Sequence, residues 1–447
     1  MKKLLKFIFT FVSSMCHGRF AGKILGMLDY CRVVVCKNKK TFAWQLHERI
    51  KLTNIIPTTE SVNNAFGRGV EDTDKIKVRI MYPAGCSWNN IHTLYEAFNE
   101  DKKYQTYVVV ENYPRFINIM NKVGCRYITL DIYDIKKDKP DIFVATYYSS
   151  SNPSINFPQV HQYVKLMIAA IPNVVMNEKN NDIHWSFISR AYRNMGPDYY
   201  LCERPVYNSL KGYVEDSKLI EVGNPQYDEI FREVGKNHPL PDSWNKIRGK
   251  KTFLWATDHG INESGPTNGF TIDLYLGPML TYFNNHPDRA LIFRPHPEFI
   301  REMQRMGHFW TATDVQKVKD YCASTPNVIW DDSHDYCFAF DACDAFLVDL
   351  NCSITCAALT TGKPICRLQR TDLCEWQISP ELENCYYYAR GMQEIERYMD
   401  MIVNGSDDKR ELRKMGMNES ILHFDGNNGS RMKTVIVDLY ERATHLA

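Results

Sequence analysis

The chain has 447 residues, more than one hydrophobic core usually organises and about right for two domains of ordinary size. Hydrophobic residues make up 44% and charged residues 24% of the chain, which excludes a disordered or fibrous protein. No apolar run approaches the roughly 20 residues of a membrane-spanning helix. A net charge of +1 argues against a nucleic-acid partner held by phosphate neutralisation.

The positive charge is concentrated at the start of the chain. Residues 1–50 carry ten Lys and Arg residues against two acids, Asp29 and Glu48. On a helix, residues 2–17 place their lysines and other polar side chains within one arc and apolar side chains on the remaining surface. This pattern is typical of a helix lying on an anionic bilayer, with lysines among the headgroups.

We therefore predict that residues 1–50 form a basic amphipathic segment that contacts the membrane surface through residues 2–17. The location expected from this is cytoplasmic, peripheral at the inner face of the cell membrane. Two alternatives remain for the same helix: packing of its apolar face on the protein core, and a signal peptide. The 14 cysteines lack paired metal-ligand spacing and are interpreted as structural thiols of a reducing compartment, with no metal site.

From about residue 76, short β-rich runs alternate with amphipathic stretches, which predicts a parallel sheet covered by helices. The strands expected in the first half are Lys77–Met81, Thr106–Val110, Arg126–Leu130, Ile142–Ala145, Asn173–Met176, Tyr199–Leu201 and Leu219–Val222. The helices expected between them are Asn89–Asn99, Pro114–Val123, Gln159–Ala170 and Pro205–Tyr213.

The segment Arg232–Lys251 is rich in Pro, Gly and Lys and is interpreted as an interdomain linker. The alternation then restarts. Strands are expected at Lys251–Ala256, Arg289–Phe293, Asn327–Trp330, Ala345–Asp349 and Pro364–Leu368, and helices at Ile272–Asn285, Ile354–Thr361, Met392–Val403 and Arg431–Thr444. The pattern predicts an α/β protein of two doubly wound domains facing across a cleft, at 75–232 and 250–430, with a C-terminal helix at 431–447.

Ligands of such sheets bind beyond the carboxyl ends of the strands. Directly after one strand the chain reads Phe293-Arg294-Pro295-His296-Pro297, where two prolines restrict the backbone around one histidine. Arg294 could bind a phosphate through its guanidinium group, and His296 could exchange a proton with a reacting oxygen. A proline-rich strand exit with a capping histidine is the structural alternative.

A second polar segment follows the strand that ends at Asp349. Asn351, Ser353 and Thr355 crowd the expected start of a helix, where free N–H groups attract anions. Ordinary N-capping explains the same residues equally well. Weaker signals are the turn Gly223-Asn224-Pro225 with Asp228, and Thr257 at the end of a strand.

Taken in this order, these segments resemble the CDP-glycerol glycerophosphotransferase family, the group of teichoic-acid polymerases and primases, over roughly residues 190–435. The matching segments are Gly223–Asp228, Trp255–Thr257, Arg294–Pro297, Val348–Ser353 with Lys363-Pro364, and Asp425-Gly426 with Ser430-Arg431. The chain departs from the family pattern in three places. Gln226 stands where the family has an arginine, the corner at Val348–Ser353 is one residue longer, and the Trp-His-Gly segment of the first domain has no counterpart.

The resemblance implies two Rossmann-like domains of GT-B type, an acceptor domain followed by a nucleotide-donor domain. It implies transfer of glycerol phosphate from CDP-glycerol, or a similar CDP-linked donor, to a hydroxyl of a lipid- or polymer-linked acceptor in cell-surface polymer synthesis. His296 and Asp349 would be catalytic, and no cofactor is expected. Arg294, Asn351, Ser353, Thr355, Thr257, Gly223, Pro225 and Asp228 would bind the donor. Two other functions remain open: a glycosyltransferase using a nucleotide sugar, and a non-catalytic protein that binds glycan or lipid.

Overall fold

A computed structural model describes residues 74–82, 87–146, 160–171, 196–236, 239–258, 270–296, 311–333, 336–349, 354–372 and 380–445, with short pieces elsewhere. The segment 2–17, for which membrane contact is predicted, lies outside the described residues, as do Asn351, Ser353 and the expected strand Asn173–Met176. Within the described part of the chain, no helix is both long enough and apolar enough to cross a lipid bilayer.

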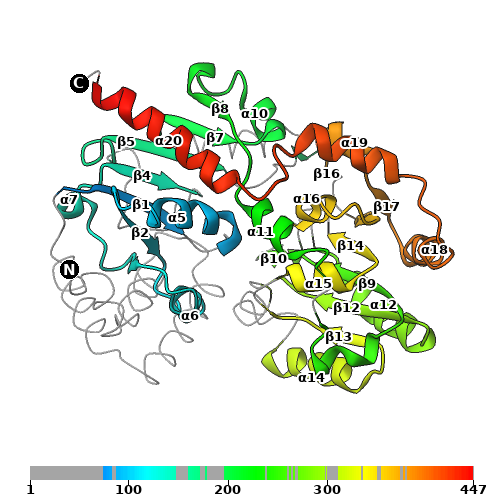
Figure 1. Cartoon of the computed structure of the whole chain (residues 1–447). Coiled ribbons are helices and arrows are strands. Elements are labelled where there is room, and N and C mark those ends of the chain that lie inside the picture. The colour runs from blue at the N-terminus through cyan, green and yellow to red at the C-terminus, as the bar shows by residue number, and fades with distance from the viewer. Residues whose placement is uncertain are drawn as a thin grey trace, which may run out of the picture.

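The first half of the chain forms a sheet of seven parallel strands (Figure 1). In chain order these are β1 (Ile76–Tyr82), β2 (Tyr104–Val110), β3 (Tyr127–Thr129), β4 (Ile142–Ala145), β5 (Leu166–Ile171), β7 (Tyr199–Cys202) and β8 (Leu219–Glu221). Their spatial order is β3-β2-β1-β4-β5-β7-β8. The strand order reverses between β1 and β4, as in dinucleotide-binding folds.

The second half repeats this arrangement with six parallel strands. They are β9 (Lys251–Ala256), β12 (Arg289–Arg294), β13 (Val328–Trp330), β14 (Ala345–Asp349), β15 (Ile365–Leu368) and β17 (Tyr387–Ala389), in the spatial order β13-β12-β9-β14-β15-β17. Here the order reverses between β9 and β14, so this sheet also has the doubly wound topology. The predicted fold class is therefore confirmed.

Helices connect the strands and cover both faces of each sheet. In the first half they are η2 (Trp88–Asn90), α5 (His92–Asn99), α6 (Pro114–Lys122), α7 (Ile135–Asp138), α10 (Arg204–Leu210), η3 (Asp216–Lys218) and α11 (Gln226–Glu233). In the second half they are η4 (Asp242–Ile247), α12 (Ile272–Asn285), α14 (Ala312–Ser324), α15 (Cys337–Ala342), α16 (Ile354–Leu359), α17 (Pro380–Glu383), α18 (Met392–Val403), α19 (Arg410–Ser420) and α20 (Asn428–His445).

Each sheet separates two hydrophobic clusters because successive side chains of a strand point to opposite faces. In β1, Val78 and Ile80 belong to the cluster under α5 and α20, whereas Met81 belongs to the cluster on the other face. In β9, Leu254 and Phe253 divide in the same way between two clusters. Burial on both faces explains why the strands are nearly continuous apolar runs. The eight cysteines that the structure describes are all free, and seven are buried.

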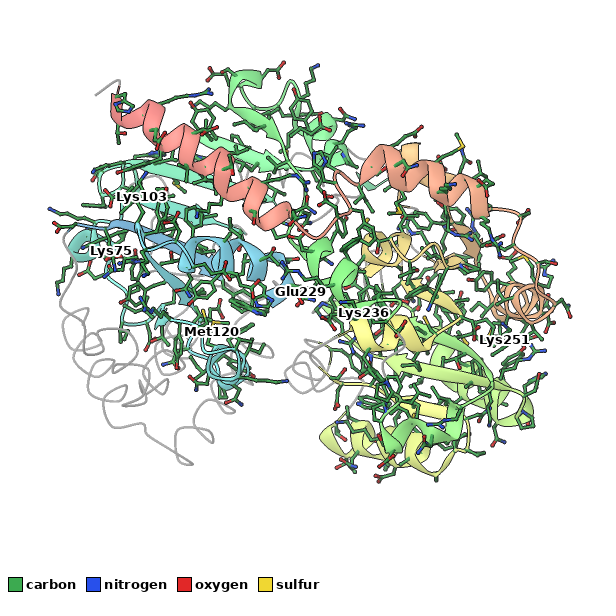
Figure 2. The ribbon with its side chains drawn as sticks, in the orientation of Figure 1. Lys75, Lys103, Met120, Glu229, Lys236 and Lys251 are labelled. Atoms are coloured by element: carbon green, nitrogen blue, oxygen red, sulfur yellow. The ribbon has the colours of Figure 1, made fainter. Side chains whose placement is uncertain are left out.

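Two elements join the halves. Helix α11 lies between them and contacts α5 and α20 on one side and α15 and α16 on the other. Figure 2 shows Glu229 of α11 at this junction. The last helix, α20, returns to the first half, where it packs along α5 (Figure 1). A short antiparallel pair, β6 (Asn177–Glu178) with β16 (Trp376–Gln377), forms a further connection between the halves; the other such pair, β10 (Ile261–Asn262) with β11 (Gly265–Pro266), lies within the second half.

Two sequence-based predictions differ from the structure. The helix expected at Gln159–Ala170 is wrong over its second half, because Leu166–Ile171 is the buried strand β5, paired with both β4 and β7. A short apolar run without alternation suits a buried helix and a central strand equally, and pairing on both edges decides for the strand. The expected linker Arg232–Lys251 is also partly packed, since Trp244 and Ile247 of η4 are buried in the core of the second half.

Candidate functional site at the carboxyl edge of the second sheet

The second sheet brings three of the predicted site residues to one edge. Strand β9 lies between β12 and β14, so the segments that follow these three parallel strands emerge side by side. The Thr257 hydroxyl, just after β9, accepts a hydrogen bond from the backbone N–H of His296 at 3.4 Å. His296 is partly exposed, whereas Pro295 before it is buried. This edge contains the point where the strand order reverses, the usual ligand position in such sheets.

Asp349, at the end of β14, connects the same edge to helix α12. Its carboxylate accepts a hydrogen bond from the backbone N–H of Asp258 at 2.8 Å, and others from the hydroxyl and the backbone N–H of Thr271. The side chain is fully buried. Burial raises the pKa of Asp349 to about 8, against the hydrogen bonds from Thr271 and Asp258, which lower it. Asp349 thus ties the loop after β9 to the start of α12.

Arg294 and Thr355, also near this edge, differ in whether their polar groups bond to the protein. The guanidinium group of Arg294 is buried, pairs with Asp331, and donates to the hydroxyl and carbonyl oxygens of Ser333 at 3.1 and 2.8 Å. It therefore holds the segment after β13. Thr355, in the first turn of α16, is buried, and its hydroxyl has no hydrogen-bond partner among the described residues. A buried hydroxyl without a partner is available to a ligand in a way that the Arg294 guanidinium is not.

Gly223, Pro225 and Asp228 lie at the joint between the halves. Asp228 is fully buried and accepts hydrogen bonds from the Thr93 hydroxyl at 2.7 Å and from the backbone N–H groups of Asn428 and Gly429 at 2.9 and 2.8 Å. A side chain at Gly223 would place its Cβ 1.8 Å from the Asn428 amide oxygen. The absence of a side chain at Gly223 therefore allows α20 to approach this turn closely, and Asp228 caps the N-terminus of α20.

The first sheet carries a carboxyl group that the sequence analysis missed. Glu203 directly follows β7, a position similar to that of Asp349 at the end of β14, and is 1% exposed. Burial raises the pKa of Glu203 to about 8, against hydrogen bonds from Asn224 and Tyr227, which lower it. An acidic residue at the carboxyl end of an apolar run was the available signal in the sequence.

Among the residues that the structure describes, one group has the composition of a metal site: His92, Glu96 and Glu229. The two ring nitrogens of His92 face different carboxylates, Glu96 at 3.2 Å and Glu229 at 2.8 Å, and Arg232 lies 3.1 Å from Glu96. Burial lowers the pKa of His92, but Glu229 and Glu96 outweigh it and leave the pKa above its ordinary value. A protonated imidazole between two carboxylates explains this cluster without a metal.

Comparison with known proteins was made at the level of sequence and of structure. No family model matches the sequence, and no curated protein matches it significantly. The S. aureus protein MnaA, solved with UDP, superposes with a TM-score of 0.58 at 13% identity, covering 80% of this chain and 95% of that one. The UDP-GlcNAc 2-epimerase of Methanocaldococcus jannaschii, in complex with UDP-GlcNAc and UDP, gives 0.57 at 12% identity over 81% and 99%.

The wall teichoic acid polymerase TagF, soaked with CDPG, superposes with a TM-score of 0.55 at 11% identity, covering 94% of this chain and 97% of that chain. Identities this low speak for the fold alone. The seven-stranded and six-stranded parallel sheets, each doubly wound, agree with that likeness. The chain therefore has the GT-B-like fold of two Rossmann-like domains that these nucleotide-binding structures share.

Proposed function

We propose that this protein is a GT-B-type transferase that moves glycerol phosphate, or a similar polyol phosphate, from a CDP-linked donor to a hydroxyl of a lipid- or polymer-linked acceptor. One observation carries the proposal: His296, Thr257 and Asp349 come together where the strand order of the second sheet reverses. Ligands of doubly wound sheets bind at this position.

In the proposed reaction, the donor diphosphate lies at this edge, near His296 and the Thr355 hydroxyl, which has no partner in the part of the chain that the structure describes. An acceptor oxygen attacks the phosphorus that bears the polyol, and CMP leaves. His296 neutralises the developing charge or relays a proton, an effect of about 10²- to 10⁴-fold in general acid–base catalysis. Asp349 keeps the surrounding loops in place through Thr271 and Asp258.

The comparison with TagF supports the polyol-phosphate donor. TagF covers 94% of this chain, whereas MnaA covers 80%, so the likeness to TagF extends over more of the chain. The motif resemblance in residues 190–435 supports the same substrate class, because it includes the Arg294–Pro297 segment. In this proposal Arg294 supports the loop after β13, since its guanidinium group is occupied by Asp331 and Ser333.

A second candidate is a GT-B glycosyltransferase that uses a nucleotide sugar. The observation in its favour is the slightly higher TM-score of structures that contain UDP, 0.58 for MnaA against 0.55 for TagF. The same edge of the second sheet would hold the diphosphate, and the acceptor would attack a sugar carbon in place of phosphorus. The leaving group, a nucleoside diphosphate in this case, distinguishes the two reactions.

The test is incubation of the purified full chain with CDP-glycerol and with several nucleotide sugars. Release of CMP supports the proposal, release of a nucleoside diphosphate supports the second candidate, and turnover of no donor refutes both and favours a non-catalytic binding protein. His296→Ala should lower turnover by about 10²-fold or more without changing the unfolding temperature. His445→Ala, at the exposed end of α20, is the matched control and should behave as wild type.

A further inference from the structure

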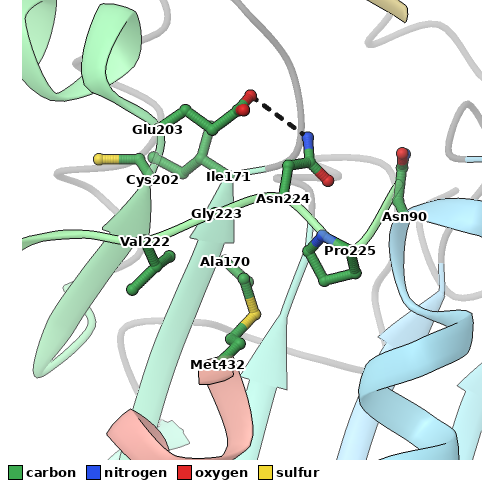
Figure 3. A pocket seen from close by; sticks show the side chains of 10 residues that line it. All are labelled: Asn90, Ala170, Ile171, Cys202, Glu203, Val222, Gly223, Asn224, Pro225 and Met432. Atoms are coloured by element: carbon green, nitrogen blue, oxygen red, sulfur yellow. Dashed lines mark hydrogen bonds between the residues drawn. The ribbon is translucent and has the colours of Figure 1, made fainter. Parts of the chain in front are cut away.

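A small cavity lies at the carboxyl edge of the first sheet, beside the start of α11. It is bounded by the ends of β5, β7 and β8, by η2 and by the first turn of α20, through residues that include Asn90, Ile171, Glu203, Pro225 and Met432. Figure 3 shows Glu203 and Asn90 on either side of the Asn224-Pro225 turn. Its volume of about 10 Å³ suits one group of the size of water or a hydroxyl.

Two polar atoms of this cavity are unsatisfied. Glu203 Oε1 and Asn90 Oδ1 are both buried, and neither has a hydrogen-bond partner among the described residues. The carboxylate oxygen and the amide oxygen are both acceptors. Buried polar atoms in proteins almost always have partners, so the pair indicates a missing group that donates a hydrogen bond. A hydroxyl group has the required size and one hydrogen, which it can donate to Glu203 Oε1.

The other oxygen of Glu203 is held in place. Glu203 Oε2 accepts hydrogen bonds from the Tyr227 hydroxyl at 3.3 Å and from the Asn224 amide at 3.5 Å. Tyr227 itself belongs to a hydrophobic cluster of the second domain, which also includes Tyr386 and Ala357. One oxygen is thus anchored and the other is left for a ligand, which is the arrangement that a positioned proton acceptor requires.

Glu203 also faces the element that follows the donor-side strand β14. Its charge contributes to raising the pKa of the Cys356 thiol, on α16, to about 12, after the larger effect of burial. Cys356 is one residue after Thr355, the residue with the unpartnered hydroxyl at the proposed donor site. The Glu203 cavity and the proposed donor site therefore lie on the two sides of the same interdomain junction.

We propose that this cavity binds the hydroxyl group of the acceptor and that Glu203 is the base that takes its proton. The inference rests on the proposed transfer from a CDP-linked donor and supplies an acceptor-side base in the domain that has no counterpart of the Trp-His-Gly segment. The acceptor O–H bond breaks and its proton passes to Glu203 Oε1. The acceptor oxygen forms a bond to phosphorus, and the bond from phosphorus to CMP breaks, with the electron pair leaving on CMP.

The ionisation of Glu203 suits this role. Its pKa of about 8 lies close to neutral pH, where a carboxylate base gains the most driving force for proton transfer. The other titratable groups near Glu203 are the thiols of Cys202 and Cys356 and the hydroxyl of Tyr227. Burial raises the pKa values of all three, so they stay neutral while Glu203 titrates. The reaction rate should rise with pH, reach half of its maximum near pH 8 and level off above it, as Glu203 becomes ionised.

The experiment follows CMP release by the full chain from CDP-glycerol, with glycerol phosphate as the hydroxyl-bearing probe, across a pH series. Glu203→Gln keeps the shape and removes the base, so turnover should fall by about 10²- to 10⁴-fold and its rise with pH should disappear. CDP-glycerol affinity should stay as in wild type, and the unfolding temperature should not fall below that of wild type. Tyr227→Phe is the matched control. It keeps the Glu203 carboxyl group but removes one hydrogen bond that lowers the pKa of Glu203, so the rise of the reaction rate should move to higher pH.

The outcomes separate this inference from the proposed function. Wild-type CMP release together with an unchanged rate and pH profile in Glu203→Gln overturns the inference and leaves the transferase standing. Loss of structure in Glu203→Gln, seen as a lower unfolding temperature with an unchanged pH profile of the residual activity, also overturns it. Failure of the wild type to release CMP overturns the proposed function and this inference together.

Discussion

Asp228 offers a direct test of how the two halves are joined. Its buried carboxylate accepts hydrogen bonds from the Thr93 hydroxyl of α5 and from the Asn428 and Gly429 N–H groups at the start of α20. Asp228→Ala would leave all three donors buried without an acceptor. A hydrogen bond to a charged group contributes about 1.5 kcal/mol or more, so the expected loss in free energy of unfolding is about 4 kcal/mol.

The assay is urea denaturation followed by circular dichroism, with Asp228→Ala compared with Thr93→Val. The second variant removes a single donor and leaves the helix cap in place, so its expected loss is about 1.5 kcal/mol. Limited proteolysis should cut Asp228→Ala near the start of α20 earlier than wild type, because the uncapped first turn opens more often. A denaturation midpoint of Asp228→Ala within error of wild type would refute the role of this carboxylate in the joint.

Three further outcomes are expected. Gly429→Ala places a Cβ 2.3 Å from the Thr93 carbonyl carbon and should lower the free energy of unfolding by about 3 kcal/mol. Gly277→Ala, with open space around the new Cβ, is the control and should not lower it. Equal urea midpoints for the two variants would contradict the close packing of α20 on α5. Since burial raises the pKa of Glu203 from 4.5 to about 8, the folded chain holds a proton that the unfolded chain releases, so stability should fall as pH rises between these values and level off above them. Glu203→Gln should reduce this slope in thermal melts and leave the part that is due to Asp349, and an unaltered slope would count against the raised pKa of Glu203. Deletion of residues 1–20 should reduce sedimentation with anionic vesicles, and unchanged sedimentation would reject the membrane-surface helix.

The sequence alone predicted the type of most elements and the fold class. Strands such as Lys251–Ala256 and Ala345–Asp349 were predicted with the boundaries that the structure has, because they are short apolar runs between polar turns. Helix Ile272–Asn285 was equally clear from its length and periodicity. The run Leu166–Ile171 was given the wrong type, since its strand state depends on pairing with β4 and β7, which no local pattern encodes. The elements β17, α14 and α19 were not predicted.

The candidate site was predictable only in part. Its segments could be found in the sequence because polar residues follow apolar strands, and His296 and Asp349 were found in this way. Which segments meet depends on strand order, and the order β12-β9-β14 places the Thr257 segment between the other two. Equally, sequence could not show that the Arg294 guanidinium is occupied by Asp331, a partner 37 residues away.

The local pattern of this chain thus determined which residues form strands, helices and strand exits, because hydrophobic periodicity and turn residues act over a few positions. The tertiary structure decided the rest. Asp228 became a helix cap through groups 200 and 201 residues along the chain, and Glu203 became a buried, raised-pKa carboxyl that bonds Asn224 and Tyr227, 21 and 24 residues away. Burial and long-range hydrogen bonding depend on where distant segments pack, and only the folded chain contains that information.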